Sequence, residues 1–118
     1  MNEDEEFARA ELLQGIGEVI ARHGEAARAG VSPEEAALAW IEAGFEDAEE
    51  VDEWLAARCF SAPGAQRLER AGITPQQAAM RTSAGTRDYE ETIGYKIIND
   101  DLSLEEARRI ITNAFWNS

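Results

Sequence analysis

The chain has 118 residues, of which 44% are apolar, and this length suits one folded domain spanning residues 1–118. Its net charge of −13 and its lack of a long apolar run exclude a membrane-spanning protein and make direct binding of nucleic acid unfavourable. The N-terminus reads Asn2-Glu3-Asp4-Glu5-Glu6, where a secretion signal would be basic, so we expect a cytoplasmic protein.

The charge is divided unevenly along the chain. Residues 1–53 contain sixteen acidic and three basic side chains, whereas residues 54–118 contain eight of each. The whole net charge therefore lies in the first half. Such an asymmetry costs self-repulsion in the folded state, and it points either to a basic partner surface or to solubility alone.

Residues 1–24 are predicted to form an N-terminal amphipathic helix, from about residue 4 to residue 22. Its apolar residues recur at helical spacing: Leu12, Leu13, Ile16, Val19 and Ile20. Asp4, Glu11 and Glu18 follow seven apart on another face. Gly15 and Gly17 each cost about 1 kcal/mol relative to alanine inside a helix, so we expect them to permit close approach of a neighbouring helix.

A short pattern recurs four times between residues 30 and 85, at steps of 14, 15 and 13 residues. Each unit has a small residue, a large apolar residue, a helix cap and a helix of about three turns. The small residues, which close the preceding helix, are Gly30, Gly44, Cys59 and Gly72. The caps are Ser32, Asp47, Ser61 and Thr74. The pattern predicts helices over residues 33–43, 48–58, 62–71 and 75–82.

These predicted helices are too short to be stable alone, so each must bury apolar residues against its neighbours. The residues expected in this core are Ala36, Trp40, Val51, Trp54, Leu55, Leu68 and Ile73. Turns of three to five residues require consecutive helices to pack side by side. Cys59, the only cysteine, is interpreted as a small packed residue.

Residues 86–118 are predicted to form a C-terminal helix pair, over residues 88–98 and 104–115. Residues 92–98 also fit a strand, but a lone strand would have no partner, so we favour the helix. The last helix is expected to bury Ala107, Ile110, Ile111 and Ala114, while the burial of Trp116 stays open. The predicted fold is all-α: a compact single-domain array of about seven short helices, with four to five helix-cap repeats of 13–15 residues.

Residues suited to catalysis or metal binding are sparse. One histidine, His23, and one cysteine cannot supply the four ligands of a structural zinc site. His23 lies at a helix end and is interpreted as a surface or helix-capping residue. No glycine-rich phosphate loop occurs, and Asn99-Asp100-Asp101 lacks the rest of a calcium loop. We therefore predict a protein that is not an enzyme and uses no cofactor or metal.

The strongest functional signal is a run of seven acidic residues with no base among them: Glu42, Glu46, Asp47, Glu49, Glu50, Asp52 and Glu53. One interpretation is a solvated helix face, since acids are favourable in the first turn of a helix. The other is that this half imitates the charge of a phosphate backbone. It would then dock, helped by Glu11 and Glu18, in a basic groove built for nucleic acid.

Residues 74–98 weakly resemble a helix-turn-helix, with residues 88–98 as the recognition helix. The turn carries Ser83 where glycine is usual, and Glu90 and Glu91 would face the phosphates. Three bases, Arg81, Arg87 and Lys96, are too few to offset them. A structural helix hairpin is therefore favoured over a DNA-binding regulator.

In size, acidity and lack of catalytic residues the chain is similar to small phage proteins that disable host nucleases, including anti-CRISPR proteins and DNA mimics. The resemblance implies stoichiometric, non-catalytic binding to a basic protein surface, such as a nuclease or a CRISPR effector complex, in the bacterial host cytosol if the chain is phage-encoded. The second hypothesis is a bacterial regulatory or scaffolding domain that binds a peptide or dimerises through an apolar groove. The oligomeric state stays open.

Overall fold

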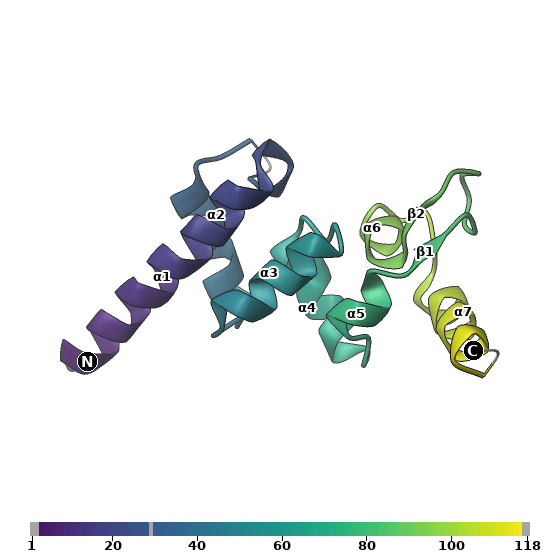
Figure 1. Ribbon diagram of the computed structural model, residues 1–118. Coiled ribbons are helices and arrows are strands. Elements are labelled where there is room, and N and C mark those ends of the chain that lie inside the picture. The colour runs from purple at the N-terminus through teal and green to yellow at the C-terminus, as the bar shows by residue number, and fades with distance from the viewer. Residues whose placement is uncertain (1–2, 29, 117–118) are drawn as a thin grey trace.

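The computed structural model describes residues 3–28 and 30–116, which form seven α-helices, one 3-10 helix and a two-stranded sheet. The elements are α1 (Glu3–His23), η1 (Glu25–Ala27), α2 (Pro33–Glu42), α3 (Ala48–Ala56), α4 (Ala62–Arg70), α5 (Pro75–Ala78), β1 (Arg81–Thr82), β2 (Glu91–Thr92), α6 (Ile93–Ile98) and α7 (Leu104–Trp116). They follow one another along a molecule of 50 × 27 × 21 Å, with α1 and α7 at opposite ends (Figure 1). The all-α prediction is confirmed.

Helices α2, α3 and α4 end in the same hydrogen-bond pattern. The closing residues have a left-handed backbone: Gly44 (φ 100°), Arg58 (φ 63°) and Gly72 (φ 85°). The next residue donates its N–H to the carbonyl five positions earlier, in the pairs Phe45–Trp40, Cys59–Trp54 and Ile73–Leu68. These three residues are buried, so packing and hydrogen bonding support each helix end together.

The left-handed residues also correct one unit of the predicted repeat. Gly30, Gly44, Arg58 and Gly72 stand fourteen residues apart, and Asp100 (φ 57°) repeats the pattern at the end of α6. The closing residue of α3 is therefore Arg58, and Cys59 occupies the buried apolar position that follows. The sequence concealed this because a non-glycine residue seldom adopts a left-handed backbone.

Each repeat helix begins at the predicted cap. The accepting side chains are Ser32 (from Glu35 N, 3.2 Å), Asp47 (from Glu49 N, 2.9 Å), Ser61 (from Gly64 N, 3.1 Å) and Thr74 (from Gln77 N, 3.1 Å). All seven residues expected in the core of this region are buried. The Trp40 and Phe45 rings pack edge to face at 5.0 Å, which joins the end of α2 to the start of the next unit.

Residues 79–92 differ from the prediction. Helix α5 ends at Ala78 and α6 begins only at Ile93, while Arg81–Thr82 pairs antiparallel with Glu91–Thr92. The helices expected over residues 79–82 and 88–92 were wrong because the strand at 91–92 does have a partner, hidden in residues 81–82. Residues 74–98 thus do not form a helix-turn-helix, and four of the six residues of α6 are buried.

The chain between β1 and β2 folds over one buried lysine. Lys96 Nζ donates to the carbonyls of Ala84 (2.6 Å) and Arg87 (3.3 Å) and lies 4.5 Å from the centre of the Tyr89 ring. Asp101 accepts from the backbone N–H groups of Arg87 (2.8 Å) and Thr86 (2.7 Å). Lys96 is fully buried, so its charge serves the fold and not a surface.

At the ends of the chain the outcome is mixed. Ala107 and Ile111 are buried as expected, but Ala114 is exposed, and the Trp116 side chain lies outside the described residues.

A Cβ atom at Gly15 would lie 3.4 Å from the Ala48 Cβ atom, so α1 does approach α3 closely there. Gly17 has nothing within 4 Å of such an atom, and the expected neighbour is missing from the described chain. No described helix combines the length and apolar character needed to cross a bilayer.

Candidate functional site

Helix α3 presents acidic side chains on every side that does not face the core. Val51, Trp54 and Leu55 point inward and are buried, whereas Glu49 and Glu53 are exposed one turn apart on the opposite side. At 3.6 residues per turn, Glu50 and Asp52 fall on the two flanks of that outer side. We call these four residues, together with Asp47, the α3 acidic face.

On the flank of α3 that faces α1, the acidic residue Asp52 has basic partners, although the sequence predicted an acidic run without any. Asp52 Oδ1 lies 2.6 Å from His23 Nε2, and Asp52 Oδ2 lies 3.8 Å from Arg22 Nη2. The acidic run contains no base, but the packing of α1 on α3 brings two basic side chains to its edge. Asp52 therefore links α1 to α3. His23 takes part in this link, so it is more than the surface or helix-capping residue that the sequence predicted.

The flank toward α4 is more acidic than expected. The pKa of Glu50 is raised above 4.5, first by burial and then by Glu69 of α4, with smaller contributions from Asp47 and Glu53. The indole N–H of Trp54 lowers the pKa of Glu50 and partly offsets this rise, although the indole nitrogen makes no hydrogen bond of ordinary geometry. Glu69 was not among the predicted site residues, because it lies nineteen residues after Glu50 in the sequence and close to two arginines, Arg67 and Arg70.

The remaining acids of the run have no basic partner. Within residues 3–28 and 30–116, no arginine, lysine or histidine forms an ion pair with Glu42, Glu46, Glu49, Glu50 or Glu53. Asp47 uses one carboxylate oxygen to cap α3. The structure thus brings Asp47, Glu50 and Glu53 together with Glu69, and it removes Asp52 from the set of unpaired charges.

Glu11 and Glu18 lie on α1 and are exposed. Their spacing of seven residues places them on one side of that helix, and Glu18 accepts a long hydrogen bond of 3.5 Å from Gln14. They form a second acidic row, on a different helix from the α3 acidic face.

The raised pKa of Glu50 predicts a small stability gain when its charge is removed. The ionised carboxylate is less favourable in the folded than in the unfolded chain, so Glu50→Gln is expected to raise the free energy of unfolding at pH 7. The gain should stay below about 0.5 kcal/mol, because solvent screens the charge of a side chain that is only partly buried. The gain should shrink as the pH falls through the folded-state pKa toward 4.5, where wild-type Glu50 becomes protonated. Thermal melts of Glu50→Gln and of a charge-matched control on the exposed side of α7, Glu105→Gln, would measure it. An equal gain in both variants would show that only the net charge matters.

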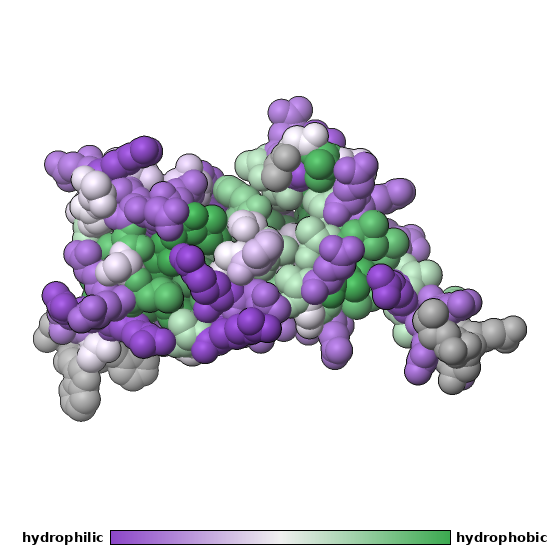
Figure 2. Space-filling view, turned by 180° about the vertical axis from the view of Figure 1, so that it is seen from behind, coloured by the Kyte–Doolittle hydropathy of each residue, from purple (hydrophilic) through white to green (hydrophobic). Residues whose placement is uncertain are grey.

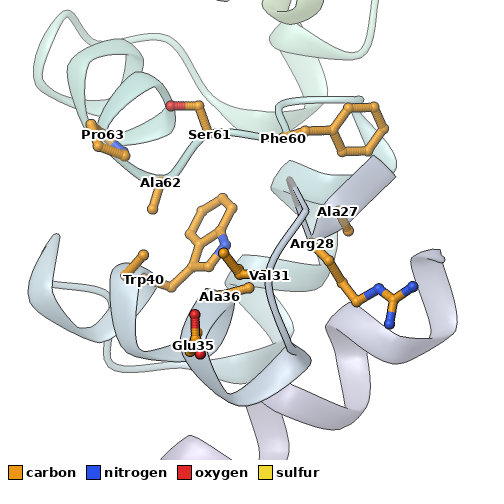
Figure 3. Close-up of a pocket in the computed structure, with 11 residues that line it drawn as sticks. Ala27, Arg28, Val31, Glu35, Ala36, Trp40, Phe60, Ser61, Ala62 and Pro63 are labelled. Carbon is orange, nitrogen blue, oxygen red and sulfur yellow. The ribbon is translucent and has the colours of Figure 1, made fainter. Parts of the chain in front are cut away.

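Two apolar grooves of about 380 Å³ each border α2 in the described chain, beside a further hollow of about 430 Å³ at Leu12, Ile41 and Phe45. The first, here called the α2–α4 groove, has Trp40 at its floor, with Ala62 and Pro63 of α4 and the exposed Val31 around it (Figure 3). The Trp40 side chain is only 2% exposed, and a base, Arg28, stands at the rim and pairs with Glu25 at 3.6 Å. A ligand there would meet mostly small side chains and a mixed charge.

The second groove, here called the α1–α2 groove, is lined by Ala10, Leu13, Gly17, Ala21 and Pro33. Its polar residues in the described chain are Gln14, Glu18 and Glu34. The face of the molecule opposite to that in Figure 1 shows apolar patches in both halves of the chain, interrupted by hydrophilic side chains (Figure 2).

Groups suited to chemistry are few in the described chain. No cluster of three or more His, Cys, Asp or Glu residues has the arrangement of a metal site among the residues described. Cys59 is fully buried, and burial raises the pKa of its thiol to about 12, so it stays protonated and does not act as a nucleophile.

The described residues thus form a small helical domain with an acidic face on α3 and apolar grooves beside α2. Comparison with protein-family models, with curated proteins and with solved structures found no match to this chain.

Proposed function

We propose that this protein is a non-enzymatic inhibitor or adaptor that docks on the basic surface of a nucleic-acid-handling protein, in the manner of anti-CRISPR proteins and DNA mimics. One observation carries the proposal: five glutamates between residues 42 and 53 have no basic partner in the described chain, and Glu69 adds a further negative charge beside them.

Electrostatics explains why such a face favours a basic partner. Unpaired like charges raise the free energy of the free protein. Repulsion of this kind, from Glu69, is the second cause after burial of the raised pKa of Glu50. Lysine and arginine side chains arrayed to neutralise phosphates would relieve this repulsion and speed the encounter. Because the contact is largely electrostatic, the complex should weaken steeply as salt concentration rises.

The test compares two variants of equal net charge. The first, Glu46→Gln/Glu49→Gln/Glu53→Gln, neutralises three acids on or beside the α3 acidic face. The second, Asp88→Asn/Glu90→Gln/Glu105→Gln, neutralises three exposed acids of the second half. Both change the net charge from −13 to −10. Immobilised wild-type protein and both variants would capture proteins from a bacterial lysate at about 50 mM and 500 mM salt.

We expect the wild type and the second variant to retain one nucleic-acid-handling protein at low salt, with release at high salt and displacement by added duplex DNA. The first variant should retain at least about tenfold less of it. Equal retention by both variants, or a captured protein that high salt and DNA leave bound, would contradict the proposal.

The two apolar grooves support a second candidate function, a regulatory or scaffolding domain that binds a peptide segment. Such a contact would depend on apolar side chains and would survive high salt. The same experiment separates the two candidates, because salt releases one partner class and leaves the other bound.

A further inference from the structure

Gly17 is a glycine that the fold itself does not require. It lies in the middle of the 21-residue helix α1, where glycine is about 1 kcal/mol less favourable than alanine. A Cβ atom at Gly15 would touch Ala48 of α3, but a Cβ atom at Gly17 would meet nothing within 4 Å. The described residues therefore leave the space over Gly17 open, and this space lies in the α1–α2 groove.

The α1–α2 groove has the length and lining expected of a binding groove for a helix. Ala10, Leu13, Gly17 and Ala21 recur at intervals of three and four residues, so they lie along one side of α1. They span eleven residue steps, or about 17 Å at 1.5 Å per residue, which is the length of a three-turn helix. Pro33 of α2 forms the opposite wall, and the groove measures about 380 Å³.

The acidic side chains at the rim of the α1–α2 groove favour a basic ligand over a second copy of this chain. Glu18 borders the groove from α1 and Glu34 borders it from α2, both exposed. A second copy of this chain would bring the same carboxylates against each other, which is unfavourable for like charges in an interface. A helix with lysine or arginine beside its apolar stripe would instead place opposite charges at both edges.

We propose that the α1–α2 groove binds an amphipathic, basic helix of a partner protein, with its apolar stripe on Leu13 and Gly17 and its cations facing Glu18 and Glu34. The inference rests on the proposed function in one respect, that the partner is basic, and it names the structural element by which that partner is held. Small residues under the helix allow its backbone to approach closely, and the acidic rim fixes its position.

The probe is a fluorescein-labelled 14-residue peptide of leucine and lysine, with leucine at helical i, i+3, i+4 and i+7 spacing, titrated by fluorescence anisotropy. A companion peptide keeps every lysine and replaces each leucine by glutamine. Gly17→Leu fills the α1–α2 groove and should also raise the melting temperature, because leucine favours a helix more than glycine does. Ala39→Leu is the matched control, since it fills the α2–α4 groove of the same volume.

We expect the leucine–lysine peptide to bind wild-type protein and Ala39→Leu within about twofold of each other, and Gly17→Leu at least about tenfold more weakly. The glutamine–lysine peptide should bind all three proteins equally and more weakly. No binding of the leucine–lysine peptide to the wild type, no loss in Gly17→Leu, a loss in Ala39→Leu alone, or wild-type dimers in sedimentation would each overturn the inference.

The acidic-face variant keeps the two proposals apart. If Glu46→Gln/Glu49→Gln/Glu53→Gln weakens peptide binding and Gly17→Leu does not, the groove inference fails, and the proposed function is unaffected because lysate capture decides it. If Gly17→Leu abolishes peptide binding while the lysate partner is indifferent to the acidic face, the groove stands and the proposed function fails.

Discussion

Gly94→Ala is expected to lower the free energy of unfolding by about 3 kcal/mol, because a methyl group there has no room. Gly94 is buried in the first turn of α6, and an added Cβ atom would overlap Cys59 Sγ and lie 3.1 Å from the Ala78 Cβ atom. Helix α6 cannot easily move away from Cys59, since the Thr92 hydroxyl donates a hydrogen bond of 2.7 Å to the Ala57 carbonyl and holds the start of α6 in place. Urea unfolding followed by circular dichroism would measure the change.

A double-mutant cycle identifies the cause. Cys59→Ala removes the overlapping sulfur, so Gly94→Ala should cost at least about 1 kcal/mol less in a Cys59→Ala background than in the wild type. Gly17→Ala is the control for glycine replacement in open space and should stabilise α1 by up to about 1 kcal/mol. Additive losses in the cycle would mean that the thiol does not occupy the space needed at Gly94.

Lys96→Met is expected to destabilise the protein by about 2 kcal/mol, although methionine is nearly as long. The substitution removes the donor to the Ala84 carbonyl (2.6 Å) and the cation over the Tyr89 ring. An acceptor left without a partner costs about 1–3 kcal/mol where it is buried, and the Ala84 carbonyl is part-buried. We also expect faster hydrogen exchange at the Thr86 and Arg87 amides, which donate to Asp101 from the same segment.

Arg70→Met is the matched control, because it makes the same change in net charge at an exposed position near the end of α4. Its effect on stability should stay within about 0.5 kcal/mol. If Lys96→Met behaved like Arg70→Met, or if amide exchange rose equally throughout the chain, the lysine would not be what holds residues 83–90.

The start and end of each repeat helix could be predicted because they depend on neighbours in sequence. Ser32, Asp47, Ser61 and Thr74 accept from N–H groups two or three residues ahead, and the closing bonds reach back five residues. The one repeat unit whose closing residue was predicted wrongly, at the end of α3, depends instead on a residue far away in the sequence. Arg58 adopts a left-handed backbone that its residue type disfavours, and its side chain is held by Glu91 at 2.7 Å, thirty-three positions away.

Residues 79–92 could not be predicted because the competing structures differ little in local free energy. Thr92 fits a strand or a helix cap, and in the structure it does both, pairing opposite Arg81 and accepting from Tyr95 N at 3.1 Å. Its bond to the Ala57 carbonyl decides where α6 begins. Two paired residues per strand are too weak a signal to stand out in a sequence.

The candidate site divides along the same line. The sequence alone identified the acidic run, its excess over the rest of the chain and the short helix that carries four of its seven residues, since these follow from composition and helical period. Packing decided which charges remain unpaired: α1 brings Arg22 and His23 to Asp52, while α4 brings Glu69 toward Glu50. Packing also left open the space over Gly17 among the described residues, in the α1–α2 groove. Hydrogen bonds within a helical turn are encoded by adjacent residues, whereas the pairing of charges depends on distances between helices that only the folded chain sets.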